Sequence, residues 1–245
     1  MGNFWSARVK FVLANFKSYA LDLLLYLEHL EKNLPKELAP FLTLFPPLLE
    51  LGACKSSRVA LGAQNAYPAK QGAFTGEITL QALQDRGIQS ILIGHSERRL
   101  LLGEDPKCCL AKFDFFKDQG FQIVFCIGEP LATRDLGASA VLDHLLDQVE
   151  GLDLNYPKLI LAYEPIWAIG TGVSAQIADI ASTIGGLKTS LKAPVRVVYG
   201  GSVQVDNADA ILSLKEVDGV LIGKACLDPQ ALLDIIRISS TKEFA

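Results

Sequence analysis

Short runs of apolar, largely β-branched residues recur along the chain, and segments with helical periodicity separate them. The apolar runs predict strands over residues 9–14, 41–45, 59–63, 90–93, 123–126, 159–163, 195–199 and 217–222. The periodic segments predict helices over residues 18–33, 80–86, 108–119, 138–149, 177–192, 207–214 and 229–238. Strands that alternate with helices pair in parallel through right-handed crossovers, and these strands are apolar on both faces, as parallel sheets require.

Roughly eight strand–helix units in 245 residues predict an α/β fold, a (β/α)8 barrel. An open doubly wound sheet is the alternative, but it typically carries a glycine fingerprint after its first strand. Here Asn15-Phe16-Lys17 follows the first predicted strand. No linker or shift in composition divides the chain, so we expect a single domain over residues 1–245. A short polar tail at about 239–245 is expected to fray.

Composition narrows the classes of protein that remain. Half of the residues are hydrophobic and 20% are charged, as in a folded domain with a substantial core. A net charge of -4 offers no basic surface, so we expect no nucleic-acid partner. The most apolar stretch, residues 21–30, is interrupted by Asp22, Glu28 and His29, so we expect no membrane span.

The cysteines and the N-terminus bear on location. The five cysteines are odd in number and lack a repeating spacing, which favours reduced thiols in a cytoplasmic protein over a disulfide framework. The N-terminus lacks the plan of a signal peptide. Residues 1–6 fit the loose pattern for N-myristoylation on Gly2, although nothing polybasic follows. A lipid-anchored accessory protein therefore stays open, and an intact mass without acylation would remove it.

One predicted strand ends in Glu164-Pro165, where proline cannot continue a ladder of hydrogen bonds. Trp167 follows, and then Gly170 and Gly172. A carboxylate before a segment that is stiff at one end and glycine-jointed at the other indicates a base beneath a closing lid. The alternative is an ordinary loop with a solvated glutamate.

Polar residues follow nearly every predicted strand. They are Asn15 and Lys17; Gln64 and Asn65; residues 94–99, which include His95; Gly128 and Glu129; Glu164; Gly200, Gly201 and Ser202; and Gly223 and Lys224. In a parallel barrel all of these lie at one rim, and polar residues at the carboxyl ends of strands indicate chemistry. No cluster of histidine and carboxylate residues has the spacing of metal ligands, so we expect no metal site.

The order and spacing of several motifs resemble one known family. They are Asn15-Phe16-Lys17, residues 62–65, residues 72–77, residues 93–99, residues 126–129, residues 162–172, residues 199–203 and residues 218–223. Over nearly the whole chain the sequence resembles the triosephosphate isomerases. That resemblance implies a (β/α)8 TIM barrel and an aldose–ketose isomerase of glycolysis and gluconeogenesis. The enzyme would interconvert dihydroxyacetone phosphate and D-glyceraldehyde 3-phosphate through an enediolate, without a cofactor.

The resemblance also implies catalytic roles. Glu164 would be the base, since a carboxylate closed under an apolar lid loses hydration and becomes more basic. His95 would polarise the carbonyl as a neutral imidazole, with Ser96 as the expected N-cap of the helix that follows. Lys17, paired with Glu97, would supply positive charge to the substrate. Asn15 would donate a hydrogen bond to a substrate oxygen.

Further roles follow from the same resemblance. Gly170, Ser202 and Gly223 match the family's phosphate clamp, in which backbone N–H groups face the anion. Tyr199 and Ser202 would latch a lid that spans residues 165–172. The loop around Thr75 would reach into a second subunit, which predicts a two-fold homodimer with Thr75 near the partner's active site.

One arginine and one substitution need separate expectations. We expect Arg98 to be structural and to pair with Glu77. Lys224 stands where the family usually has glycine. If its N–H still binds phosphate, the change adds a charge near the anion; if the position needs φ above zero, lysine is strained there. We expect activity to survive, and Lys224→Gly to change the Michaelis constant more than the turnover number.

Other functions stay open on the sequence alone. One is another phosphosugar barrel enzyme, either an epimerase or a Schiff-base aldolase that uses Lys17 or Lys224. An epimerase would more typically show a metal site or an acid pair, and borohydride would trap an aldolase lysine with its substrate. Another is a non-enzymatic binding protein on the same fold. Its expected signature, loss of Glu164, His95 or Lys17, is not found in this sequence.

Overall fold

A computed structural model of the chain describes residues 9–53, 56, 58–169 and 175–242. Its strands are β1 (Phe11–Asn15), β2 (Leu42–Phe45), β3 (Ala60–Leu61), β4 (Ser90–Ile93), β5 (Gln122–Ile127), β6 (Leu159–Tyr163), β7 (Arg196–Tyr199) and β8 (Gly219–Ile222). Its α-helices are α1 (Leu23–Asn33), α2 (Leu48–Ala53), α3 (Leu80–Gln84), α4 (Ser96–Leu101), α5 (Pro106–Asp118), α6 (Leu131–Arg134), α7 (Ala138–Gln148), α8 (Ile177–Leu191), α9 (Val205–Leu212) and α10 (Pro229–Ser239). Short 3-10 helices span Ala39–Phe41, Ile166–Ala168 and Lys224–Leu227.

The strands form one parallel sheet that closes on itself. Neighbouring strands follow the order β3-β2-β1-β8-β7-β6-β5-β4. The two ends of this order meet where Ala63, just past β3, pairs in parallel with Ile91 of β4. The Ala63 N–H donates to Ser90 and the Leu92 N–H donates to Ala63, both at 2.9 Å. The predicted (β/α)8 barrel is therefore confirmed.

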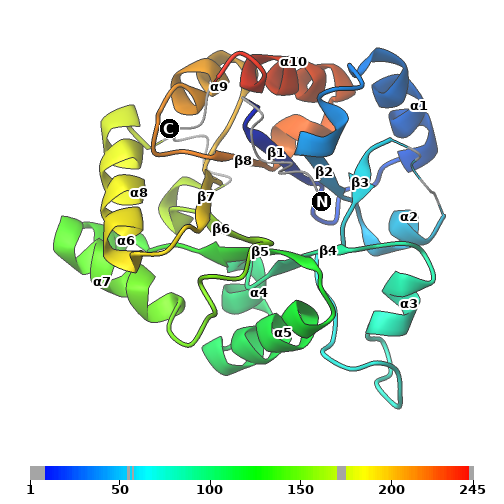
Figure 1. Cartoon of the computed structure of the whole chain (residues 1–245), viewed down its shortest axis with the longest axis horizontal. Helices are drawn as coiled ribbons and strands as arrows, with labels where there is room; N and C mark the ends of the chain where they lie inside the picture. The colour runs from blue at the N-terminus through cyan, green and yellow to red at the C-terminus, as the bar shows by residue number, and fades with distance from the viewer. Residues whose placement is uncertain (1–8, 54–55, 57, 170–174, 243–245) are drawn as a thin grey trace.

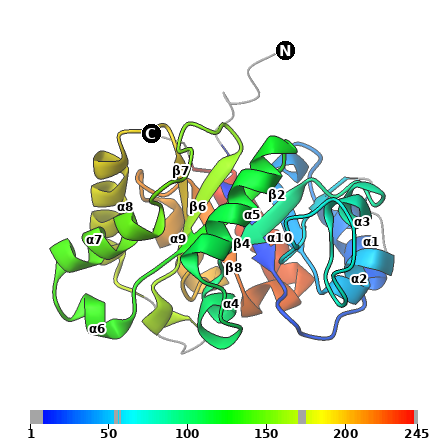
Figure 2. The same ribbon diagram turned by 90° about the horizontal axis from the view of Figure 1, so that it is seen from below.

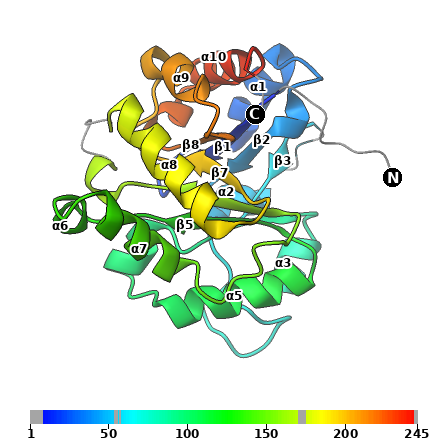
Figure 3. The ribbon, with the colours of Figure 1, turned by 60° about the vertical axis from the view of Figure 1, so that its left-hand side comes forward.

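The helices surround this ring of strands. In Figure 1 the strands occupy the centre, with α10 and α1 at the top and right and α7 and α8 at the left. Figure 2 shows helices on both sides of the strands, and Figure 3 brings α7 and α8 in front of them. No helix in the described ranges is long and apolar enough to cross a membrane.

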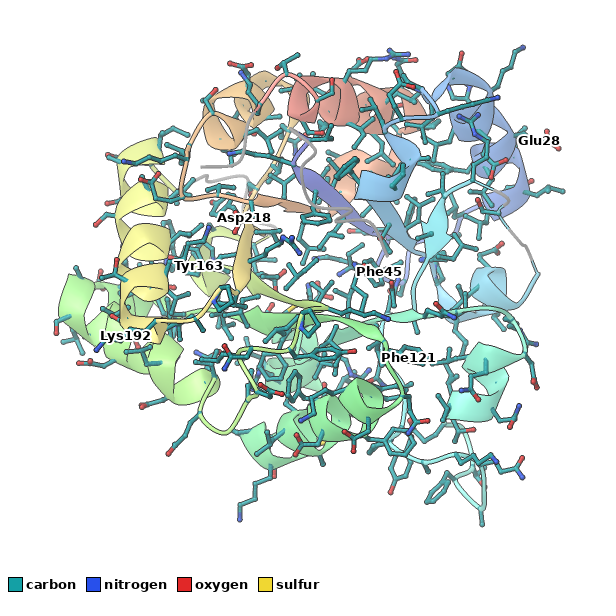
Figure 4. All side chains as sticks on the ribbon, in the orientation of Figure 1. Glu28, Phe45, Phe121, Tyr163, Lys192 and Asp218 are labelled. Carbon is teal, nitrogen blue, oxygen red and sulfur yellow. The ribbon has the colours of Figure 1, made fainter. Side chains whose placement is uncertain are left out.

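The alternation of side chains along each strand builds two cores. Phe11 and Leu13 of β1 point into the barrel, where they join Phe45, Leu92 and other inward residues. Figure 4 shows Phe45 among the strands, while Glu28 lies on the outer surface of α1. The other face of each strand packs beneath the helices. Because alternate residues point to the same face, the side chains that end an inward series face the rim of the barrel.

The strand predictions hold closely, but several boundaries differ. The predicted helix over residues 18–33 begins only at Leu23, because the Asp22 carboxylate accepts the Leu25 N–H at 3.0 Å and caps it there. β3 is shorter than residues 59–63, and Gly62 packs against the Phe45 ring. The sequence pattern did not predict the short helices α2 and α6, because they hold too few residues to show a helical period.

The first residue of the predicted tail belongs to the last helix. Ser239 is buried and ends α10, and Lys242 forms an ion pair of 2.7 Å with Asp209. The last residues of the predicted tail, 243–245, lie outside the described ranges.

Candidate active site

Asn15 and Lys17 form a tight turn at the end of β1. Asn15 is the last residue of the strand and is buried, and its Oδ1 accepts the Lys17 N–H at 3.0 Å. Lys17 has φ +52°, a left-handed conformation that is uncommon outside glycine. The Gln64 amide fixes the turn by donating to the carbonyl of Lys17 at 2.7 Å. In this arrangement the Lys17 ammonium lies 2.6 Å from Glu97 Oε1, as expected.

His95 is held between β4 and α4. Gly94, at φ +68°, turns the chain out of β4, and the Arg99 guanidinium binds its carbonyl at 2.7 Å. The expected N-cap, Ser96, is wrong: His95 is the N-cap, because its Nδ1 accepts the Glu97 N–H at 3.3 Å. Ser96 is instead the buried first residue of the helix. Accepting at Nδ1 leaves Nε2 as the nitrogen that carries a proton in the neutral ring.

Glu164 directly follows β6, and the alternation of that strand turns its side chain into the barrel mouth. Ile160 and Ala162 point inward, whereas Tyr163, labelled in Figure 4, packs on the outer face. The Glu164 residue is only 3% exposed. Its Oε1 lies 3.3 Å from His95 Nε2, and its Oε2 has no hydrogen-bond partner in the described part of the chain. A buried carboxylate oxygen without a partner is costly. Because Glu129 Oε2 is in the same state, the functional role of Glu164 is inferred from its position facing His95 at the barrel mouth.

Two glycines let the Glu164 segment approach its neighbours. A Cβ at Gly128 would overlap the carbonyl oxygen of Glu164. A Cβ at Gly200 would lie 2.7 Å from the Cγ of Glu164. The Glu164 N–H donates to Ile127 at 2.8 Å, which fixes the backbone between these contacts.

The protonation of His95 depends on its acidic neighbours. Burial is the largest single influence and lowers the pKa of His95, but the Glu164 and Glu97 carboxylates together raise it by more. The net shift in the pKa of His95 is therefore upward. It favours the protonated ring, which runs against the neutral imidazole that the family resemblance implies.

One cavity of about 440 Å³ connects most of the predicted site residues. Its lining includes Asn15, Lys17, His95, Glu164, Ser202, Gly223 and Lys224. Since β4 and β8 are four places apart in the closed sheet, His95 and Lys224 stand on opposite sides of the mouth. The structure thus brings these predicted residues together. Gly170 lies outside the described residues.

Lys224 begins the short 3-10 helix Lys224–Leu227, directly after Gly223. The positive-φ residues other than glycine are Lys17 and Lys192 within the described ranges, so Lys224 is not in the left-handed region. Of the two alternatives left open for Lys224, strain from a left-handed backbone therefore does not apply. Its side chain is exposed and lines the cavity.

The first part of the predicted lid is held by Glu129. Trp167 Nε1 and the Tyr163 hydroxyl donate to Glu129 Oε1 at 3.0 and 3.1 Å. Glu129 is fully buried, and the sequence places it after a strand without giving it a role, although Glu129-Pro130 after β5 repeats the Glu164-Pro165 pattern after β6. That repeat was the available signal.

The two predicted latch residues lie close to this segment. The Ser202 hydroxyl donates to the Ala168 carbonyl at 2.8 Å. Tyr199 is fully buried, and burial raises its pKa to about 12. Its hydroxyl lies near the Ala175 backbone but makes no regular hydrogen bond with any described residue.

The predicted pairing of Arg98 with Glu77 is wrong. Arg98 Nε lies 3.0 Å from Glu104 Oε2, because the turn after α4 brings Glu104 back beneath the arginine. Glu104 also pairs with the buried ammonium of Lys112, which donates to Asn65 Oδ1 at 2.7 Å. This buried network anchors the helix that carries His95 and Glu97.

The remaining predicted residues fall away from the cavity. Thr75 is exposed at the tip of its loop, where Tyr67 and Phe74 stack with ring centroids 4.4 Å apart. His29 is exposed and His144 is half-buried on the outer helices, consistent with surface or packing roles. Tyr19, at the cavity mouth, was missed because nothing in its local sequence marks it. In the described part of the chain, no group of three or more His, Cys, Asp or Glu side chains is placed to hold a metal ion.

A closed parallel barrel, with a buried carboxylate and an imidazole facing each other in a cavity at its mouth, defines a (β/α)8-barrel enzyme. A family model for triosephosphate isomerase matches residues 10–239. The chain belongs to the triosephosphate isomerase family.

Individual relatives agree with this assignment. A triosephosphate isomerase of Helicobacter pylori (strain Shi470) is 50% identical over 230 residues, which cover 93% of this chain and 98% of the relative. Triosephosphate isomerases of Wolinella succinogenes and of Sulfurovum sp. (strain NBC37-1) are each 51% identical, over 195 and 192 residues. These matches cover 79% and 78% of this chain, and 83% and 82% of the respective relatives.

Proposed function

We propose that this protein is an aldose–ketose isomerase that interconverts dihydroxyacetone phosphate and D-glyceraldehyde 3-phosphate, as in glycolysis and gluconeogenesis. The observation that carries the site assignment is the 3.3 Å approach of Glu164 Oε1 to His95 Nε2 within the cavity. A proton can move between adjacent carbons only if a base lies near the carbons and a hydrogen-bond donor lies near the oxygens. This pair supplies both groups.

In the proposed mechanism Glu164 removes a proton from the substrate carbon beside the carbonyl. The electrons of the broken C–H bond form the carbon–carbon double bond of an enediolate. His95 gives its Nε2 proton to the former carbonyl oxygen and takes up the proton of the neighbouring hydroxyl. Glu164 returns its proton to the former carbonyl carbon, which leaves the new carbonyl on the carbon that first lost its proton. The unpartnered Oε2 of Glu164 favours this role, since it is desolvated without being committed to a protein donor.

Lys17 and Asn15 would stabilise the negative charge that develops on the substrate oxygens. The turn at the end of β1 holds both side chains at the cavity, and the contact with Glu97 fixes the Lys17 ammonium. In other enzymes, removal of one preorganised donor of this kind raises the activation barrier by about 3–4 kcal/mol.

The substrate phosphate would bind on the side of β7 and β8. Ser202, Gly223 and Lys224 line the cavity there, and barrel enzymes commonly place phosphate beside these strands. Glycine exposes its backbone N–H to an anion. The proposed clamp also includes Gly170, which the description of the structure does not cover.

The segment from Pro165 to Gly172 would close over the substrate, with Tyr199 and Ser202 as latches. Closure would exclude water, which protects an enediolate phosphate from losing its phosphate group. The near approach of Tyr199 to Ala175 and the bond from Ser202 to Ala168 support this assignment.

Assembly and location belong to the proposal as well. We infer a two-fold homodimer in which the exposed loop at Thr75 approaches the partner's active site. The exposed leucines Leu48 and Leu49, 51% and 85% exposed, favour burial against a second copy of the chain. A cytoplasmic location agrees with the expected reduced thiols.

A Schiff-base aldolase is the alternative enzyme. Its lysine would have to attack a carbonyl as a free amine, whereas the Lys17 Nζ is held in a contact of 2.6 Å with Glu97 Oε1. Borohydride with triose phosphate tests this alternative directly. A trapped adduct on Lys17 or Lys224 would favour the aldolase.

The deciding experiment compares the native chain with Glu164→Gln in a coupled assay of glyceraldehyde 3-phosphate isomerisation. Glutamine keeps the size of the side chain and cannot act as the base. We expect turnover to fall by several orders of magnitude in the variant, with an unchanged circular dichroism spectrum. Equal turnover in both proteins would refute the assignment of Glu164 as the base, whereas an inactive, folded native protein would refute the proposed reaction.

A further inference from the structure

The charges around the cavity are unevenly compensated. Among its lining residues Lys17 and Lys224 are positive and Glu164 is negative. Glu97 stands directly behind Lys17, at 2.6 Å, and so compensates the Lys17 charge at short range. Lys224 is exposed and forms no ion pair with an acidic group of the described chain. Its ammonium is therefore available to a ligand.

Lys224 adds to the attraction that the cavity exerts on an anion. Beside it, the cavity is lined by Lys17, whose charge Glu97 offsets at 2.6 Å, and by Glu164. An exposed ammonium at the phosphate side of the cavity therefore strengthens the field that draws in a phosphate dianion.

The position of Lys224 separates this charge from the reacting groups. Lys224 follows β8, opposite β4 and His95 across the barrel mouth. Ser202 of the β7 loop and Gly223 share this side of the cavity. The side chain can thus reach a phosphate bound near Ser202 and Gly223 without contacting the carbons that exchange the proton.

We propose that the Lys224 side chain selects the dianionic phosphate of the substrate and makes substrate capture dependent on ionic strength. This inference rests on the proposed function, which it extends from a backbone clamp to a charged side chain. It predicts that removal of the charge raises the Michaelis constant and leaves the turnover number nearly unchanged, because Lys224 acts on binding and not on the proton transfer.

The expected size of the effect follows from screening. The Debye length is about 30 Å at 0.01 M ionic strength and about 3–4 Å near 1 M, so an exposed charge acts on a dianion mainly at low salt. We expect Lys224→Met to lower kcat/KM for glyceraldehyde 3-phosphate about tenfold at 0.01 M and about twofold or less at 0.5 M.

The chain offers matched controls. Lys215 lies before β8, at the opposite end of the barrel from Lys224, and its side chain is 80% exposed. Lys215→Met removes the same net charge from the protein without touching the cavity and should leave kcat/KM within twofold at both salt concentrations. Lys224→Arg keeps the charge and should retain most of the native salt dependence.

The experiment measures kcat and KM for the four proteins at both salt concentrations, with unphosphorylated glyceraldehyde as a second substrate. A tenfold loss at low salt that appears only for Lys224→Met, only with the phosphorylated substrate and mainly in KM supports the inference. Equal constants for Lys224→Met and Lys215→Met would overturn it, and so would an equal loss with glyceraldehyde.

A binding measurement separates this inference from the proposed function. If the native chain does not isomerise triose phosphates, the proposed reaction is refuted, but the question whether Lys224 binds phosphate is still open to measurement. Titration calorimetry with inorganic phosphate at 0.01 M ionic strength answers that question. A dissociation constant that rises several-fold in Lys224→Met, and not in Lys215→Met, supports Lys224 as a phosphate ligand. An unchanged constant overturns it.

Discussion

The contact between Gly200 and Glu164 allows a sharp test of how exactly the carboxylate must be placed. Gly200 follows β7, and a Cβ at this position would lie 2.7 Å from Glu164 Cγ and 3.3 Å from Oε1. The backbone of Gly200 is outside the left-handed region, so alanine can adopt its conformation. The effect of Gly200→Ala is therefore steric and acts on the side chain of the proposed base.

The size of the displacement can be worked out from the contact. Two carbon atoms pack best at about 3.5–4.0 Å, so Glu164 Cγ has to retreat by about 1 Å. A misplacement of about 1 Å in a reacting group costs about 100-fold in rate. That loss corresponds to about 2.7 kcal/mol of activation free energy. The free energy of unfolding should fall by only about 1–3 kcal/mol, as for other overpacked sites.

The assay is steady-state isomerisation together with urea unfolding of the same preparations. Gly186→Ala is the control, because Gly186 lies in α8 and its nearest neighbour would be Leu142 Cδ2 at 3.9 Å. The control should keep native kinetics and gain about 0.5–1 kcal/mol from helix propensity. If folded Gly200→Ala keeps a turnover within threefold of the native value, the close packing of Glu164 against Gly200 is not needed for catalysis and the reasoning is refuted.

Two further predictions concern the ionisable groups around His95. Glu104→Gln should lower the free energy of unfolding by about 3–5 kcal/mol in urea, because it leaves the buried Lys112 ammonium without its carboxylate. Asp114→Asn is the control, an exposed change on α5, the helix that carries Lys112; its free energy of unfolding should stay within about 0.5 kcal/mol of the native value. Equal losses in the two variants would contradict a stabilising role for the network of Glu104, Lys112 and Arg98. The pKa of His95, which burial lowers and Glu164 raises in the native chain, should fall in Glu164→Gln, because the main group that raises it loses its charge while burial remains. Because the pKa of His95 is higher in the folded than in the unfolded chain, its protonation adds stability that is fully present below about pH 6.5 and is lost as the pH rises through the pKa of the folded state. The free energy of unfolding of the variant should lack this dependence on pH. Histidine NMR titration measures the pKa, with exposed His29 as the reference, and an unmoved His95 resonance profile would contradict the assigned coupling.

The strands and the inward residues at their ends could be predicted because they depend on local rules. An apolar run fixes a buried strand, and alternation fixes which residue faces the barrel mouth. Asn15 and Glu164 are placed by these rules alone. The pairing of Lys17 with Glu97 came from family resemblance, and the structure confirms it.

The errors arose where contacts between distant or competing groups decide the outcome. Serine is the usual N-cap type, but the imidazole of His95 takes the Glu97 N–H and moves the helix start by one residue. Arg98 pairs with Glu104 and not Glu77 because a turn brings the nearer carboxylate beneath it. The need for glycine at positions 128 and 200 depends on the approach of a different loop, which no local pattern reveals.

The two Glu-Pro pairs explain how one strand ending can serve two purposes. Each places a carboxylate at the end of a barrel strand and then stops the ladder with proline. Glu129 spends its Oε1 on Trp167 and Tyr163, so it holds the start of the proposed lid. Glu164 lines the cavity, and its Oε1 lies 3.3 Å from His95 Nε2. The Oε2 atoms of both carboxylates lack a hydrogen-bond partner in the described chain, so the two residues differ in what their Oε1 atoms contact and in their access to the cavity. This contrast predicts that Glu129→Gln, which retains an acceptor for Trp167, is tolerated far better than Glu164→Gln.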